Sequence, residues 1–142
     1  MDEALSESSN ALPEATLKRL RELRQGLLHL HKTLLEMERA DFERVSGRLT
    51  SGELLQIVIN HEQFAWLRMI SALVVGIDEM FDAEEPATPS DVQNVLSQTR
   101  ALFSSSADEV FRKKYQAALQ REPEVAMVHS EVTRLLRNEA PA

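Results

Sequence analysis

The longest apolar stretch of the chain lies near its centre, and it limits what the rest can fold into. It runs from Glu53 to Phe81 and reads ELLQIVINHEQFAWLRMISALVVGIDEMF. If this stretch is one helix, its apolar side chains fall on both sides, and a helix that is apolar nearly all round is a buried one. Arg68 and Asp78 bracket its most apolar run, which is far shorter than the ~20 residues that a bilayer requires. We therefore expect a continuous central helix over residues 51–81, covered by neighbouring helices or by a second subunit.

The overall composition is that of one acidic domain. The chain has 142 residues and a net charge of −7, which argues against a nucleic-acid partner and against an anionic membrane surface. It has no cysteine, so disulfide and thiol chemistry are excluded. Residues 1–11 are acidic and polar and lack the basic and apolar regions of a signal peptide, so we expect a disordered tail and a cytoplasmic protein. We place a single helical domain at residues 12–139.

Apolar residues spaced three and four apart predict helices along the rest of the chain. The first helix should run from about Pro13 to Val45. The third should begin at Thr88, with Asp91 completing its cap, and the fourth should begin at Pro123. The fold class that follows is all-α, an antiparallel up-down-up-down four-helix bundle. The clearest stripe belongs to the first helix and consists of Leu20, Leu23, Leu27, Leu30, Leu34 and Met37.

Capping signals predict where the chain turns and where it bends. Thr50 and Glu53 form the pattern of a capping box, so the second helix should start at once after a short turn. The three serines Ser104–Ser106 interrupt the apolar stripe of the third helix, and we expect a kink or a break there. Ser105 and Asp108 would then restart the helix as a new capping box.

Several polar residues fall where a core is expected. His31 and Glu38 lie on the apolar face of the first helix and Asp41 lies at its edge. Glu62 lies in the middle of the apolar face of the second helix, next to His61. Antiparallel pairing of these helices would gather Glu38, Asp41, His61 and Glu62. A buried carboxylate must be protonated, paired or metal-bound, so these four are candidate metal ligands.

Two interpretations of this cluster stay open. Carboxylates and histidines that project into a four-helix bundle hold iron or manganese in di-metal proteins. The Glu-x-x-His spacing typical of those sites is absent here, because Glu62, for example, is followed three positions later by Ala65. The other interpretation is that Glu38 and Glu62 pair with arginines or with His61 at the rim of the core and that no cofactor is bound.

The sequence contains no catalytic motif, but it contains candidates for an interface. A Gly-rich phosphate loop, a Ser-His-Asp arrangement and a metal-finger spacing are all missing. Trp66, the only tryptophan, is expected in the core. If the second helix has an exposed side, Trp66 becomes the natural interface anchor, together with Phe64 and Leu67.

One stretch of the chain carries motifs that are shared with other proteins. Residues 27–79 contain a run of leucines with His31 and Lys32, followed by SGELLQ, FAWLR and IDE. On these motifs the chain resembles a family of small uncharacterised bacterial helical proteins. The resemblance implies a soluble helical domain and transfers no catalytic residue. The fold also resembles hemerythrin-like or DinB-like bundles, but the histidines here do not match their ligand patterns.

Two hypotheses of function follow. The first is a non-enzymatic interaction or structural module that forms a homodimer or binds a protein partner, because surplus apolar surface usually marks a partner site. The second is a bundle that binds a metal or a small ligand through Glu38, Asp41, His61 and Glu62. We expect neither a nucleic-acid partner nor a membrane partner.

Overall fold

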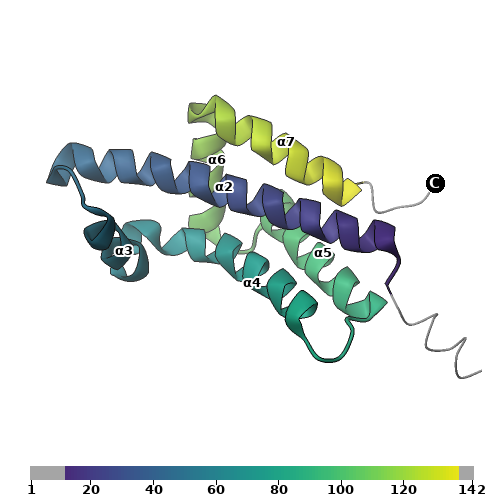
Figure 1. The fold of residues 1–142 in the computed structure, drawn as a ribbon. Coiled ribbons are helices and arrows are strands. Elements are labelled where there is room, and N and C mark those ends of the chain that lie inside the picture. The colour runs from purple at the N-terminus through teal and green to yellow at the C-terminus, as the bar shows by residue number, and fades with distance from the viewer. Residues whose placement is uncertain (1–11, 138–142) are drawn as a thin grey trace, which may run out of the picture.

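The computed structural model describes residues 12–137, and every regular element in this range is a helix. The predicted all-α fold is therefore confirmed. None of the described helices is long and apolar enough to cross a membrane. The predicted tail at residues 1–11 and the end of the predicted domain at residues 138–139 lie outside the described residues. The elements in chain order are α2 Glu14–Ser46, α3 Ser51–Asn60, the 3-10 helix η1 Glu62–Leu67, α4 Arg68–Asp82, α5 Pro89–Ser105, α6 Glu109–Arg121 and α7 Pro123–Arg137 (Figure 1).

The 33-residue helix α2 is the long axis of the molecule (Figure 1). It packs against α7 on one side and against α4 on the other, and α5 contacts both of these helices. α6 joins α5 to α7 and also touches η1. The predicted leucine stripe faces this core, since its five leucines are buried, while Met37 is partly buried. The amphipathic pattern of the first helix thus positions the remaining elements.

The contact between α2 and α7 is close because a glycine lies within it. A Cβ atom added at Gly26 would lie 3.1 Å from Cγ2 of Val132. At the end of the same pair, the Arg19 guanidinium donates to the carbonyl oxygens of Leu135 and Leu136 over 3.1 and 3.3 Å. These carbonyls belong to the last turn of α7, where a backbone carbonyl has no N–H partner within the helix.

The prediction of one continuous helix over residues 51–81 is wrong, because the chain breaks at His61. α3 ends at Asn60, and the side chain of His61 accepts a hydrogen bond from the backbone N–H of Gln63. The Arg68 guanidinium donates to the carbonyl of Ile59, so an α4 residue caps the C-terminal end of α3. Side chains therefore satisfy the backbone groups that the break would otherwise leave unpaired.

The third predicted helix is also divided, at the serines that suggested a bend. α5 ends at Ser105 and α6 begins at Glu109. The new cap is Asp108, whose carboxylate accepts from the N–H of Phe111 over 2.9 Å, rather than Ser105. With two of the four predicted helices broken, the up-down-up-down four-helix arrangement is not confirmed.

The capping signals agree closely with the structure. Thr50 and Glu53 form a complete capping box at the start of α3. Thr88 and Asp91 form another at the start of α5. In both boxes the threonine hydroxyl accepts from the backbone, and the acidic side chain accepts from the threonine N–H in return.

Candidate functional site

Glu38 is the one member of the predicted polar cluster that lies in the core. It is 6% exposed, and both of its carboxylate oxygens accept hydrogen bonds. Oε2 accepts from Nε1 of Trp66 over 2.7 Å, and Oε1 accepts from Nε2 of Gln63 over 2.9 Å. Nζ of Lys114 lies 3.9 Å from Oε2. The carboxylate is therefore satisfied by three side chains of η1 and α6, which is what a buried acid requires.

Asp41 lies one turn further along α2 and has different partners. Its carboxylate accepts two hydrogen bonds from the Arg121 guanidinium over 2.6 and 2.7 Å and one from Arg44 over 2.8 Å. The hydrogen bonds from Arg121 hold the pKa of Asp41 below its ordinary value. This fork-shaped pair fastens the end of α6 to α2.

The other two members of the predicted cluster are exposed. The break rotates Glu62 out of the apolar face on which one continuous helix would have placed it. The ring of His61 stands edge-on to Phe42 at a centroid distance of 5.2 Å. Among residues 12–137 no group of three or more histidine and acidic side chains is arranged to hold a metal ion.

The residues predicted as interface anchors lie in the core instead. Phe64, Trp66 and Leu67 are all buried, because η1 turns them toward α2 and α6. Trp66 packs edge-on against Phe111 at a centroid distance of 5.6 Å. Their apolar surface is already covered within the chain, so they do not form a surface for a partner.

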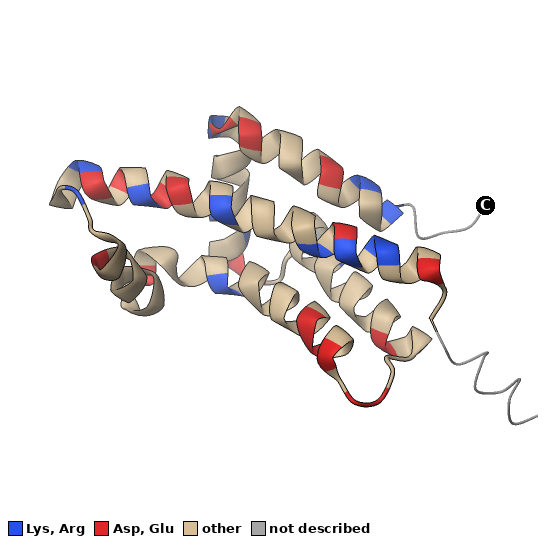
Figure 2. Ribbon diagram, in the orientation of Figure 1, with Lys and Arg blue, Asp and Glu red and all other residues tan. Residues whose placement is uncertain are grey.

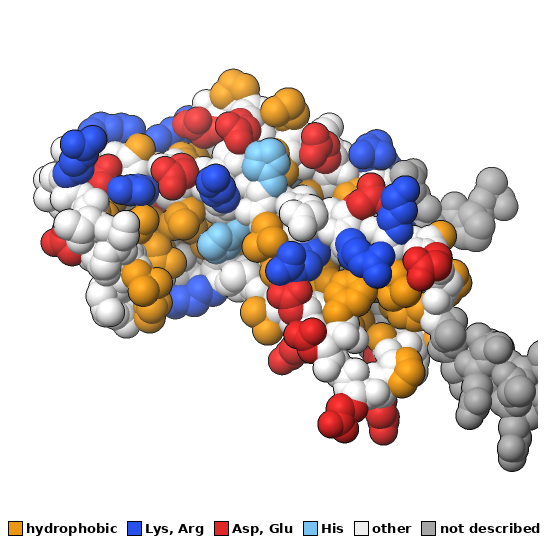
Figure 3. All heavy atoms as spheres, in the orientation of Figure 1, with side chains coloured by type: hydrophobic (Ala, Val, Ile, Leu, Met, Phe, Trp, Pro, Cys, Tyr) orange, Lys and Arg blue, Asp and Glu red, His pale blue; other side chains and the backbone are white. Residues whose placement is uncertain are grey.

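A different apolar set is exposed on α3. This helix has no buried residue, and it packs mainly on η1. Leu55 and Ile59 lie one turn apart and are 58% and 52% exposed. Apolar side chains gather on the molecular surface at this end of the molecule (Figure 3). The sequence signal for this surface is that the apolar helix 51–60 carries a single charged residue, Glu53, whose side chain is used in the capping box.

A second set of exposed apolar residues lies on α4. Ala72 and Val75 lie on its outer face, and Val75 is 53% exposed. Beside them a shallow groove of about 400 Å³ runs between α4 and α5, lined by Arg68, Met69, Ala72, Leu73, Gln98 and Leu102. We call Leu55, Ile59, Ala72, Val75 and this groove the α3–α4 surface.

The charged residues are distributed unevenly along the molecule. Charges of both signs lie near the connection from α2 to α3, where Arg48 is exposed and Arg44, in the last turn of α2, binds Asp41 (Figure 2). Acidic residues lie at the end of α4 and in the connection to α5, where Glu79, Asp82, Glu84 and Glu85 are exposed (Figure 2). Within the described part of the chain these four acids form no ion pair.

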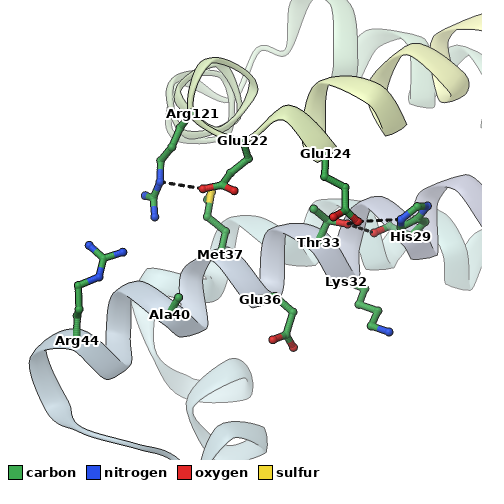
Figure 4. A pocket seen from close by; sticks show the side chains of 10 residues that line it. All are labelled: His29, Lys32, Thr33, Glu36, Met37, Ala40, Arg44, Arg121, Glu122 and Glu124. Atoms are coloured by element: carbon green, nitrogen blue, oxygen red, sulfur yellow. Dashed lines mark hydrogen bonds and ion pairs between the residues drawn. The ribbon is translucent and has the colours of Figure 1, made fainter.

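A second hollow, of about 410 Å³, lies between α2 and the junction of α6 with α7 (Figure 4). Its polar side chains are largely engaged with one another. Glu124 accepts from Thr33 and lies 3.2 Å from Nε2 of His29, and Arg121 binds Glu122 over 3.2 Å. Charges of both signs line the hollow, so it selects no ligand by charge and is the weaker candidate.

Comparisons with known proteins do not assign this site. The chain matches no family model, no curated protein and no solved structure. The resemblance on SGELLQ, FAWLR and IDE therefore stays an expectation from the sequence.

Proposed function

We propose that this chain is a non-enzymatic protein-interaction module and that it binds its partner through the α3–α4 surface. The observation that carries the proposal is α3, a ten-residue helix in which no side chain is fully buried and Leu55 and Ile59 are more than half exposed. Burying a leucine or isoleucine side chain stabilises a protein by roughly 1.5–3 kcal/mol relative to leaving it in water. Leu55 and Ile59 realise only part of this within the chain, and a partner that covers them gains the rest.

The composition of the α3–α4 surface supports a protein as the partner. The cores of protein interfaces are depleted in charged residues. The apolar residues Leu55, Ile59, Ala72 and Val75 make up most of this surface, and Arg68 is the one charged residue that lines it. A shallow groove open to solvent suits a helix or a flat protein face better than a small molecule, which is usually enclosed. The polar groups that might serve catalysis, Glu38 and Asp41, are held by neighbouring side chains.

Site-specific photo-cross-linking in cells that express the protein tests this proposal. A photoreactive residue replaces Leu55 in one variant and Val110 of α6 in a control, because Val110 is 59% exposed and lies outside the α3–α4 surface. The proposal predicts adducts of discrete mass from position 55 and none from position 110. Adding Ile59→Lys to the first variant should abolish them. Equal adducts from both positions, or none from position 55, would contradict the proposal.

A further inference from the structure

We infer that the partner is a second copy of this chain, paired so that α3 of each copy lies against α4 and the α4–α5 groove of the other. This inference rests on the proposed function and names its partner. It follows from the position of a ridge, Leu55 and Ile59 of α3, beside the groove, from the lengths of the two helices, from Arg48 and the acids at the end of α4, and from the area that a stable dimer needs.

The α3–α4 surface is self-complementary because a ridge and a groove lie next to each other. Arg68 marks the junction between them. Its guanidinium donates to the carbonyl of Ile59 at the end of α3, and its side chain also lines the groove beside α4. A two-fold axis near Arg68 therefore places the ridge of each copy over the groove of the other, which is the geometry of an isologous dimer.

The lengths of the helices agree with this pairing. α3 has ten residues and is about 15 Å long at 1.5 Å per residue. With its C-terminal end near the axis, the N-terminal end of the partner's helix would lie roughly ten residues along α4 from Arg68, beside Asp78 and Glu79. The apolar side chains of the ridge would then cover Ala72 and Val75, which lie between these points.

The charges agree as well. Arg48 lies three residues before the start of α3, so the same pairing brings it toward Glu79 and Asp82 of the other copy. Arg48 precedes α3, and the acids lie at the far end of α4 (Figure 1), so an antiparallel pairing brings Arg48 of each copy toward the acids of the other. Like charges would meet in the parallel pairing, which is disfavoured.

The area also favours a second copy. A stable interface buries about 800 Å² on each partner. Two-fold pairing makes every copy bury both its ridge and its groove. The pairing thereby doubles the buried area without any further surface.

Sedimentation equilibrium of the purified full-length chain tests the inference. The chain has a mass of 16.1 kDa, and we expect the wild type to approach twice this mass between about 1 and 100 µM. Ile59→Lys places a charge at the centre of the interface and should weaken association by about 30-fold or more. The matched control Val110→Lys adds the same charge at an equally exposed apolar position and should leave association unchanged.

A charge reversal provides a second test that does not alter the apolar surface. Arg48→Glu should weaken association by about 5-fold, and adding Glu79→Arg to the same chain should restore it. Circular dichroism identifies any variant that has lost helix. Restoration by the double variant requires that the two residues meet across two copies, since they lie at opposite ends of one copy.

The outcomes separate this inference from the proposed function. A wild type that stays monomeric at about 100 µM overturns the second copy as partner. So does a dimer that Ile59→Lys does not weaken. In either case, adducts of a different chain from position 55 would leave the interaction function standing, and the absence of any adduct would overturn that function too.

Discussion

Glu38 connects the sequence to the architecture more directly than any other residue. Its carboxylate binds Trp66 and Gln63, and its backbone carbonyl accepts a second hydrogen bond from Nε2 of Gln63 over 3.2 Å. The chain therefore forms a 3-10 helix at the level of Glu38, where a continuous α-helix would direct these side chains elsewhere. Glu38, which the sequence suggested as a metal ligand, thus stabilises the break in the predicted central helix.

Removing the Glu38 carboxylate should destabilise the fold. Glu38→Ala leaves the buried indole N–H of Trp66 without an acceptor, which should lower the free energy of unfolding by about 1–3 kcal/mol. Glu38→Gln keeps one acceptor oxygen and should cost less. Urea denaturation followed by Trp66 fluorescence measures both. The exposed Glu36→Ala is the control, and a loss no larger than that of the control would contradict the role given to Glu38.

His31 shapes the response of the fold to acid. It is half-buried, makes no hydrogen bond within residues 12–137, and burial lowers its pKa. Below about pH 6.5 the unfolded chain therefore binds a proton that the folded chain resists, so the free energy of unfolding falls as the pH falls. The loss ends once the pH is below the folded-state pKa. Burial lowers the pKa of His129 in the same way.

His31→Gln should accordingly reduce the loss of stability between about pH 7 and about pH 5. The reduction is partial, because His129 keeps its own contribution. Urea denaturation at both pH values measures the difference, and the exposed Gln25→Ala should behave as the wild type does. Equal losses in His31→Gln and in the wild type would show that burial of His31 does not determine the acid response.

Among the elements, α3 depends on its cap and on η1 more than on the core. Thr50→Ala removes the capping box, at a cost of roughly 1 kcal/mol. Because α3 has no fully buried side chain, this cost should appear as more frequent local unfolding of α3. In dilute protein the amides of residues 54–60 should exchange about 5-fold faster, with little change in global unfolding.

The matched variant is Thr88→Ala, which removes the same kind of box from α5. That helix buries Val92, Val95 and Leu96, so its cap should contribute to the global free energy of unfolding. If Thr50→Ala lowered global stability as much as Thr88→Ala, α3 would belong to the cooperative core, contrary to its exposure.

The sequence predicted helix boundaries well where neighbouring residues determine them. The first helix was expected over residues 13–45 and is observed as α2, Glu14–Ser46. The two threonine boxes and the start at Pro123 depend on residues within one turn of each other, so the sequence reveals them. The break at the three serines was also visible, although Asp108 supplies the cap.

The break at His61 was not predictable, because its causes are distant in sequence. Gln63 is held by Glu38, 25 residues earlier, and Arg68 reaches back to α3 across the break. The apolar pattern is the same on both sides of His61. It therefore indicates that the segment is buried, but it does not indicate whether the helix is continuous. Trp66 lies in the core as expected, and Ile59 is exposed, so the exposed apolar residues are not the conditional interface anchors Phe64, Trp66 and Leu67.

The described helices pack into one core, and α3 is the one helix among them that has no fully buried side chain. α2, η1, α4, α5, α6 and α7 all contribute buried residues to the core, while α3 packs Ile57 and Val58 against it and leaves Leu55 and Ile59 more than half exposed. On the dimer proposed above, a second copy of the chain covers the exposed apolar residues of α3.

Hydrogen exchange at two protein concentrations tests this claim most directly. If a second copy covers α3, amides of α3 and of the outer face of α4, near Ala72 and Val75, become more protected as the concentration rises from about 1 to about 100 µM. Amides of α6 around Val110 should not change. Protection that is the same at both concentrations throughout α3 would contradict the claim.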